Sequence, residues 1–130
     1  AAYELDRVVQ LAAERDVYMM LSLLNHGQFS TSTNPQWDEN PYNSANGGPC
    51  DEPACFADNP DAVRLWNQRL RYIVARWGYS PNIMSWEFWN EVNWTPLAGE
   101  AVLGPWIQRS AAVIRSVRSC ASRTALRYSP

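Results

Sequence analysis

Two continuous apolar runs, separated by one amphipathic segment, constrain the fold of this chain most strongly. The first run is "VYMMLSLL" at residues 17–24, and the second is "IMSWEFW" at residues 83–89. A run that is almost entirely apolar indicates a strand buried on both faces, which is typical of parallel sheets. Parallel strands need a long crossover between them, and a helix is the usual one. The two runs therefore predict a parallel βαβ unit.

The segment between the runs carries helix signals at both ends. Asn59 can cap the first turn, Pro60 fits the first helical position, and Gly78 follows the last turn. Apolar residues recur at helical spacing along one face: Val63, Trp66, Leu70, Ile73, Val74 and Trp77. Residues 3–16 and 104–123 predict two further amphipathic helices. The predicted order is helix, strand, loop, helix, strand, loop, helix.

Strands that alternate with helices indicate an α/β fold in which helices cover a parallel sheet. The chain has 130 residues, of which 46% are apolar and 18% are charged, as in one globular domain. Two strands do not complete a sheet, so we expect a segment of a larger α/β domain. Unpaired strand edges and uncovered helix faces should make the isolated chain a poor folder.

Composition excludes several classes of partner. A net charge of −2 leaves no basic surface for nucleic acid. No apolar run approaches the roughly 20 residues of a membrane-spanning helix, and the N-terminus lacks a signal-peptide pattern. Cys50 and Cys55, in "CDEPAC", are close enough in sequence to form a disulfide. Such a bridge would suit a secreted protein in an oxidising compartment, and two free thiols in a cytoplasmic protein are the alternative.

Polar clusters follow both predicted strands. "NHGQFS" begins at residue 25 and opens a long loop that reaches residue 56, and "NEVNW" begins at residue 90. Parallel α/β folds place their sites at the carboxyl ends of strands, on the loops that lead into helices. We therefore expect the two clusters to share one edge, with Glu91 as the last strand residue, pointing into a cleft.

The stretch "YSPNIMSWEFWNEVNW" resembles the fourth-strand motif of glycoside hydrolase clan A, the retaining (β/α)8-barrel enzymes that include family 5 cellulases and mannanases. "NHGQFS", and the helix that runs into "WGYSPNI", look like the third βα unit of such barrels. The resemblance extends over residues 3–106. It implies that residues 1–130 are a fragment of a single (β/α)8 TIM-barrel domain, roughly from its second to its fourth helix, and that no cofactor takes part.

By this resemblance Glu91 is the general acid/base and Asn90 contacts the 2-hydroxyl of the sugar. The substrate is then a β-linked polysaccharide or oligosaccharide, cleaved by double displacement. Such cleavage needs one carboxyl group to protonate the leaving oxygen and a second carboxylate as nucleophile. Aromatic neighbours favour the protonated form of the acid because they penalise its charge. In the clan the nucleophile ends the seventh strand, which lies outside this chain.

Other residues are candidates for sugar contacts. His26 is either a structural group or a donor to a sugar hydroxyl, and a lone histidine without suitably spaced carboxylates predicts no metal site. Trp37 and Trp94 either stack on pyranose rings or pack within their loops. Polar side chains of the long loop are further candidates for hydroxyl contacts: Asn40, Tyr42 and Asn43. Glu87 is interpreted as structural, paired with an arginine from a neighbouring element.

Two other hypotheses stay open. The aromatic residues and His26 could hold a glycan without any chemistry, or the chain could be a structural α/β fragment whose carboxylates are both ion-paired. An Asn–Glu pair at a strand end favours the enzyme, because a binding module needs no acid there.

Overall fold

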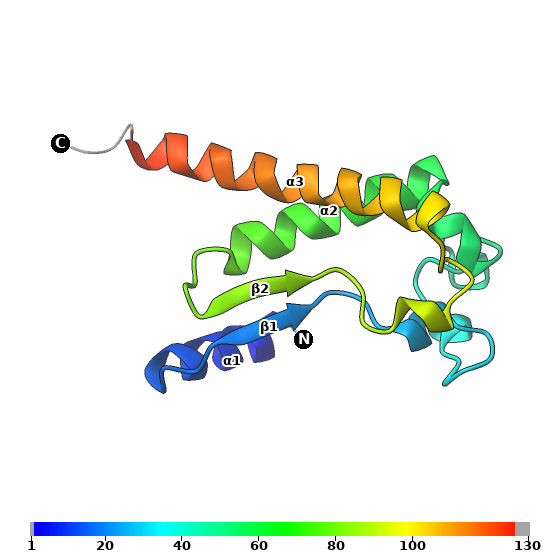
Figure 1. The fold of residues 1–130 in the computed structure, drawn as a ribbon, viewed down its shortest axis with the longest axis horizontal. Coiled ribbons are helices and arrows are strands. Elements are labelled where there is room, and N and C mark those ends of the chain that lie inside the picture. The colour runs from blue at the N-terminus through cyan, green and yellow to red at the C-terminus, as the bar shows by residue number, and fades with distance from the viewer. Residues whose placement is uncertain (1, 127–130) are drawn as a thin grey trace.

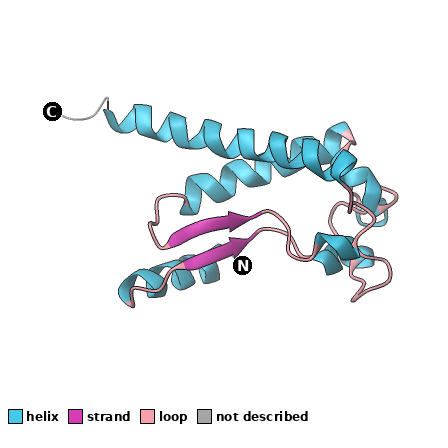
Figure 2. Ribbon diagram, viewed as in Figure 1, coloured by secondary structure: helices cyan, strands magenta, loops and turns pink. Residues whose placement is uncertain are grey.

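The computed structural model describes residues 2–126 and confirms the predicted order of helices and strands (Figures 1 and 2). In this part of the chain, five short 3₁₀ helices, η1–η5, lie in the connections. The long elements are α1 Ala2–Glu14, β1 Met19–Ser22, α2 Pro60–Trp77, β2 Ile83–Glu87 and α3 Glu100–Leu126.

The two strands pair in parallel, as expected for a βαβ unit. Both are shorter than their apolar runs. The last pair of the ladder is Ser22 and Glu87, and an isolated bridge follows between Asn25 and Asn90. Both segments therefore advance by three residues from one pair to the next. Parallel ladders use every second residue of a strand, so an advance of three breaks the regular pattern there. The strands therefore end before the polar clusters begin.

One face of the sheet is uncovered in the described part of the chain. Side chains of β1 alternate, with Met19 and Leu21 partly buried and Met20 and Ser22 exposed. Met20 is 62% exposed. The expectation that this strand is buried on both faces is therefore wrong for residues 2–126. The apolar side chain of Met20 therefore lies mostly in solvent on the uncovered face.

The helices are joined by specific polar contacts as well as by packing. Asp6 of α1 accepts hydrogen bonds from Arg76, at 3.0 and 2.6 Å, and from the indole nitrogen of Trp77 at 2.9 Å. The indole nitrogen of Trp66 donates to the buried Ser110 hydroxyl at 2.9 Å and so ties α2 to α3. Helix α3 begins four residues before the predicted start at Gly104, and Gly99 accepts its first backbone bonds.

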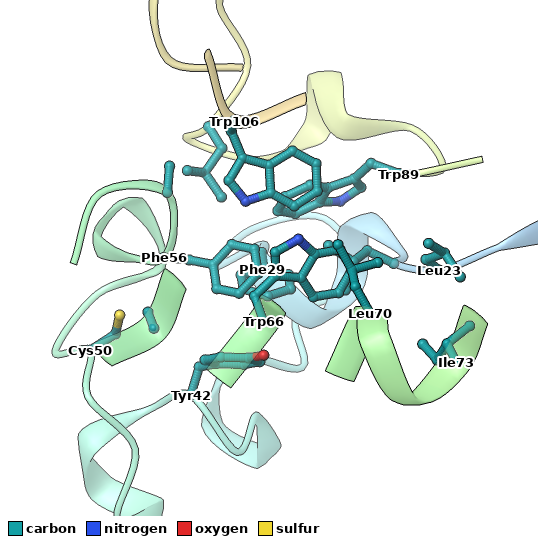
Figure 3. Close-up of a cluster of buried hydrophobic side chains, with 14 of the residues drawn as sticks. Leu23, Phe29, Tyr42, Cys50, Phe56, Trp66, Leu70, Ile73, Trp89 and Trp106 are labelled. Atoms are coloured by element: carbon teal, nitrogen blue, oxygen red, sulfur yellow. The ribbon is translucent and has the colours of Figure 1, made fainter. Parts of the chain in front are cut away.

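The densest part of the core lies beside the loops. We call the buried rings of Phe29, Phe56, Trp66, Trp89 and Trp106 the aromatic core (Figure 3). Ring centroids are 4.5 Å apart for Phe29 and Phe56, 4.8 Å for Phe29 and Trp89, and 5.3 Å for the stacked Trp66 and Trp106. The aromatic core joins the long loop to α2, to α3 and to the segment after β2, which fixes the loop against the helices.

The loop from Asn25 to Phe56 contains no α-helix and no strand, as predicted, yet it is well anchored. The side-chain oxygen of Asn43 accepts from Ala45 at 3.0 Å while its amide donates to the Trp37 carbonyl at 3.1 Å. Cys50 and Cys55 form a disulfide with a Cα–Cα distance of 5.5 Å, which confirms the predicted pairing. None of the helices among residues 2–126 has both the length and the hydropathy that crossing a membrane requires.

Candidate functional site

The two polar clusters meet at the carboxyl ends of β1 and β2, as predicted. The backbone nitrogen of Asn90 donates to the Leu24 carbonyl at 2.9 Å, and the backbone nitrogen of His26 donates to the Asn90 carbonyl at 3.1 Å. These bonds hold the two loop starts side by side. His26 also opens η1 (His26–Phe29), a turn capped by the side chain of Asn25. The backbone beneath the site is therefore fixed from both strands.

Glu91 does not end a strand, and that prediction is wrong. Strand β2 ends at Glu87, and Glu91 adopts a left-handed conformation with φ 55° and ψ 42°. This conformation costs a non-glycine residue roughly 1–2 kcal/mol, because its Cβ crowds the following carbonyl oxygen. It turns the chain from the strand into η5 (Val92–Trp94). The Glu91 side chain is 55% exposed, so the described aromatic residues do not enclose its carboxylate.

His26 lies directly beside this carboxylate. Its Nδ1 is 3.1 Å from Oε2 of Glu91, within ion-pair distance, and its side chain is 9% exposed. Neither ring nitrogen has a well-aligned hydrogen-bond partner among the described residues. The Nδ1 and Oε2 atoms are therefore close to each other, but their geometry is not that of a well-aligned hydrogen bond. Catalytic hydrogen bonds are often poorly aligned in substrate-free sites.

A cleft of about 600 Å³ opens at the same edge of the sheet. It is lined by Asn25 and Asn90, the residues directly before His26 and Glu91. Gln28, Arg69 and Glu87 also line it. Amides, a guanidinium and a carboxylate offer both donors and acceptors, which suits a ligand rich in hydroxyl groups.

Glu87 has no ion pair with a described residue, contrary to the expectation that it pairs with an arginine. Arg69 lines the same cleft and donates to the Leu23 carbonyl at 3.3 Å. Gln28 and Arg69 were not singled out from the sequence. Gln28 belongs to the quoted "NHGQFS" cluster, whereas nothing in the sequence marks Arg69, because it lies on the polar side of a long helix.

The candidate sugar-binding aromatics differ sharply in exposure. Trp37 is only 7% exposed and packs near Phe29, with ring centroids 6.0 Å apart, so its face is not available to a sugar. Trp94 is 51% exposed and lies three residues after Glu91. Of the two candidates, Trp94 alone presents an accessible ring at this edge.

The polar residues proposed for hydroxyl contacts are buried parts of the loop. The amide of Asn40 donates to the Gln28 carbonyl at 2.5 Å, and its oxygen accepts from the backbone of Tyr42 at 2.9 Å. Burial raises the pKa of the Tyr42 hydroxyl, and nearby Arg69 partly offsets this effect. Asn40, Tyr42, Gln28 and Arg69 line a second, polar cavity of about 330 Å³. These residues therefore shape the loop first, and their contribution to a ligand site is secondary.

Comparison with known proteins adds no identification. No protein-family model, no curated protein and no solved structure matches the chain. Among residues 2–126, no group of three or more histidine, cysteine or acidic side chains is arranged to hold a metal ion. What the site can do therefore follows from its own geometry: a half-exposed carboxylate, a buried imidazole beside it, and a polar cleft.

Proposed function

We propose that this chain is part of a retaining glycoside hydrolase acting on β-linked polysaccharides or oligosaccharides, and that Glu91 is its general acid/base. We also propose that residues 1–130 are a fragment of a (β/α)8 barrel, with one sheet face destined for the barrel interior. The observation that carries the proposal is the position of Glu91. Its carboxylate is accessible, follows Asn90, and stands at the carboxyl edge of a parallel strand pair.

The chemistry requires a proton for the leaving oxygen and a second carboxylate roughly 5–5.5 Å away to attack the sugar. Glu87 does not suit the second role. It is the last residue of β2, only four residues before Glu91 on the same segment, whereas the nucleophile must face the acid across the anomeric carbon. The nucleophile is therefore assigned to a residue outside this chain. Asn90 and the exposed ring of Trp94 are the proposed sugar contacts.

The disulfide between Cys50 and Cys55 supports a location outside the cytoplasm. Disulfides persist in oxidising compartments, and polymeric glycans are too large to enter a cell intact. We therefore place the enzyme among secreted or extracellular proteins that degrade polysaccharides.

The test replaces Glu91 by glutamine in the complete enzyme, which supplies the nucleophile, and compares two substrates. Glu91→Gln should lower hydrolysis of a natural β-glycan by about 10²–10⁴-fold, because the alkoxide leaving group loses its acid. A dinitrophenyl glycoside, whose leaving group needs no proton, should keep most of its glycosylation rate. Added azide should restore turnover of that substrate, since an anion attacks the glycosyl-enzyme without a general base.

Glu87→Gln is the matched control, because it removes the carboxylate that lines the neighbouring cleft together with Asn90. It should affect both substrates equally. If Glu91→Gln lowers the activity on both substrates equally and azide restores none of it, Glu91 is not the general acid/base. Retained glycan binding without any hydrolysis by the unaltered complete protein would favour the alternative, a non-catalytic carbohydrate-binding site around Trp94.

A further inference from the structure

The imidazole of His26 is buried, and the proposed function has not yet given its two ring nitrogens a role. Its side chain is 9% exposed, and neither ring nitrogen has an aligned partner within residues 2–126. Buried polar atoms are nearly always hydrogen-bonded, so an unmatched pair calls for an explanation. The nearest candidate partner for Nδ1 is the Glu91 carboxylate, whose Oε2 lies 3.1 Å away.

Both residues are held by backbone features that do not depend on this contact. His26 is fixed by its bond to the Asn90 carbonyl and by the capped turn η1. Glu91 is fixed by its left-handed backbone, and its carbonyl accepts from the Trp94 nitrogen at 3.1 Å. The strained conformation of Glu91 persists only because the surrounding structure determines it. The backbone therefore brings the imidazole and the carboxylate together before any substrate binds.

We propose that His26 is a positioning residue that orients the Glu91 carboxyl group, an inference that rests on the proposed function. Nδ1–H donates to Oε2 of Glu91, which leaves Nε2 as an acceptor in the neutral ring. A half-exposed glutamate samples several rotamers, and a rigid, buried donor restricts them to the one that faces the leaving oxygen. A direct sugar contact is the weaker interpretation, because so little of the imidazole is exposed.

Two substitutions distinguish the role of Nδ1 from that of Nε2. His26→Asn keeps a donor near the position of Nδ1, whereas His26→Gln keeps one near Nε2 and removes the Nδ1 donor. The measurement, made on the complete enzyme that supplies the nucleophile, is kcat/KM for a pair of aryl glycosides, one with a poor and one with a good leaving group, since kcat/KM reports the glycosylation step.

His26→Gln should lower kcat/KM for the poor leaving group by up to about 100-fold, as for a misplaced catalytic group, and change it less than about 3-fold for dinitrophenolate. His26→Asn should recover most of the lost rate. Equal losses for both leaving groups would mean that His26 binds the sugar or supports the fold, and the proposal would be overturned. The same holds if asparagine recovers no more than glutamine does.

Nitrogen NMR provides a readout that does not need activity. His26 is the only histidine in the chain, and its signal is identified by its loss in His26→Asn. In the neutral imidazole, the ¹⁵N shifts should report the Nδ1–H tautomer, and Glu91→Gln should change them. The Nε2–H tautomer, or ¹⁵N shifts that are unchanged in Glu91→Gln, would refute the hydrogen bond between His26 and Glu91. Failure of the proposed function is recognised separately, by a protein that hydrolyses neither glycoside but keeps this NMR signature.

Discussion

The aromatic core and the open face of the sheet are built in opposite ways. In the aromatic core, Phe29, Phe56 and Trp66 are buried completely or nearly so, each against other rings, and the disulfide closes the adjoining loop. On the open face, Met20 stands in solvent on a strand of four residues. Phe29 and Phe56, from a loop that has no α-helix and no strand, are thus more deeply buried than the exposed side chains of β1. Burial in these two regions therefore does not follow the type of backbone structure.

The difference has a consequence for the candidate site, which lies between the two regions. His26 and Asn90 are joined to each other. They follow the ends of β1 and β2, and they stand close in the chain to Phe29 and Trp89 of the aromatic core. The aromatic core therefore supports the site from the side of the long loop. The strand side leaves room for further strands, as the proposed barrel requires.

The largest expected effect comes from truncating the aromatic core. Phe56→Ala should lower the free energy of unfolding by about 3–5 kcal/mol, because it leaves a cavity among rings that are fully enclosed. In the isolated 130-residue chain, Met20→Ala should change it by less than about 0.5 kcal/mol, since most of the side chain is exposed there. Urea denaturation of both variants measures the contrast. Similar losses would show that the open face is covered in solution.

Removing the disulfide should have the next largest effect. Replacing Cys50 and Cys55 together by serine should cost about 2 kcal/mol, because the bridge closes a short ring and restricts the unfolded chain. Thermal unfolding with and without a reductant measures the same difference in the unaltered protein. An unchanged transition would mean that the aromatic core alone orders the loop.

Relieving the backbone of Glu91 should stabilise the fold at the expense of the site. Glu91→Gly should raise the free energy of unfolding by about 1 kcal/mol, because glycine adopts the left-handed conformation without strain. Asp16→Gly is the control, since Asp16 has φ 53° but a side chain that tolerates this conformation better. It should gain less. A destabilised Glu91→Gly variant would show that the contact with His26 outweighs the strain.

The smallest effect is expected at Asp6, which joins α1 to α2. Its hydrogen bonds from Arg76, and next from Trp77, hold its pKa below the usual value. A depressed folded pKa contributes stability above the unfolded value of about 3.9, and this contribution is lost as the pH falls through the folded pKa. Asp6→Asn should therefore lose a little stability near neutral pH and match the unaltered protein in acid. Asp61→Asn, in an exposed pair with Arg64, is the control.

The elements that the sequence predicted well are those with local signals. Helix α2 begins and ends within a residue of the predicted limits, because Asn59 accepts from Asp61 and Ala62 and Pro60 opens the first turn. The spacing of Cys50 and Cys55 made a disulfide possible and left two free thiols as the alternative, and the structure contains the disulfide. The start of α3 was missed, because Pro105 suggested a first turn that Gly99 and Glu100 supply earlier.

The sequence alone also determined that two polar clusters would meet, because parallel strands bring their carboxyl ends to one edge. It could not determine which side chains would be accessible there. The burial of Trp37, the exposure of Trp94 and the left-handed turn at Glu91 depend on residues far away in the chain. The 3.1 Å approach of His26 to Glu91 joins positions 65 residues apart, and only the ladder between Asn25 and Asn90 brings them together. Local signals set where elements begin and end, whereas long-range packing decides which way a side chain faces.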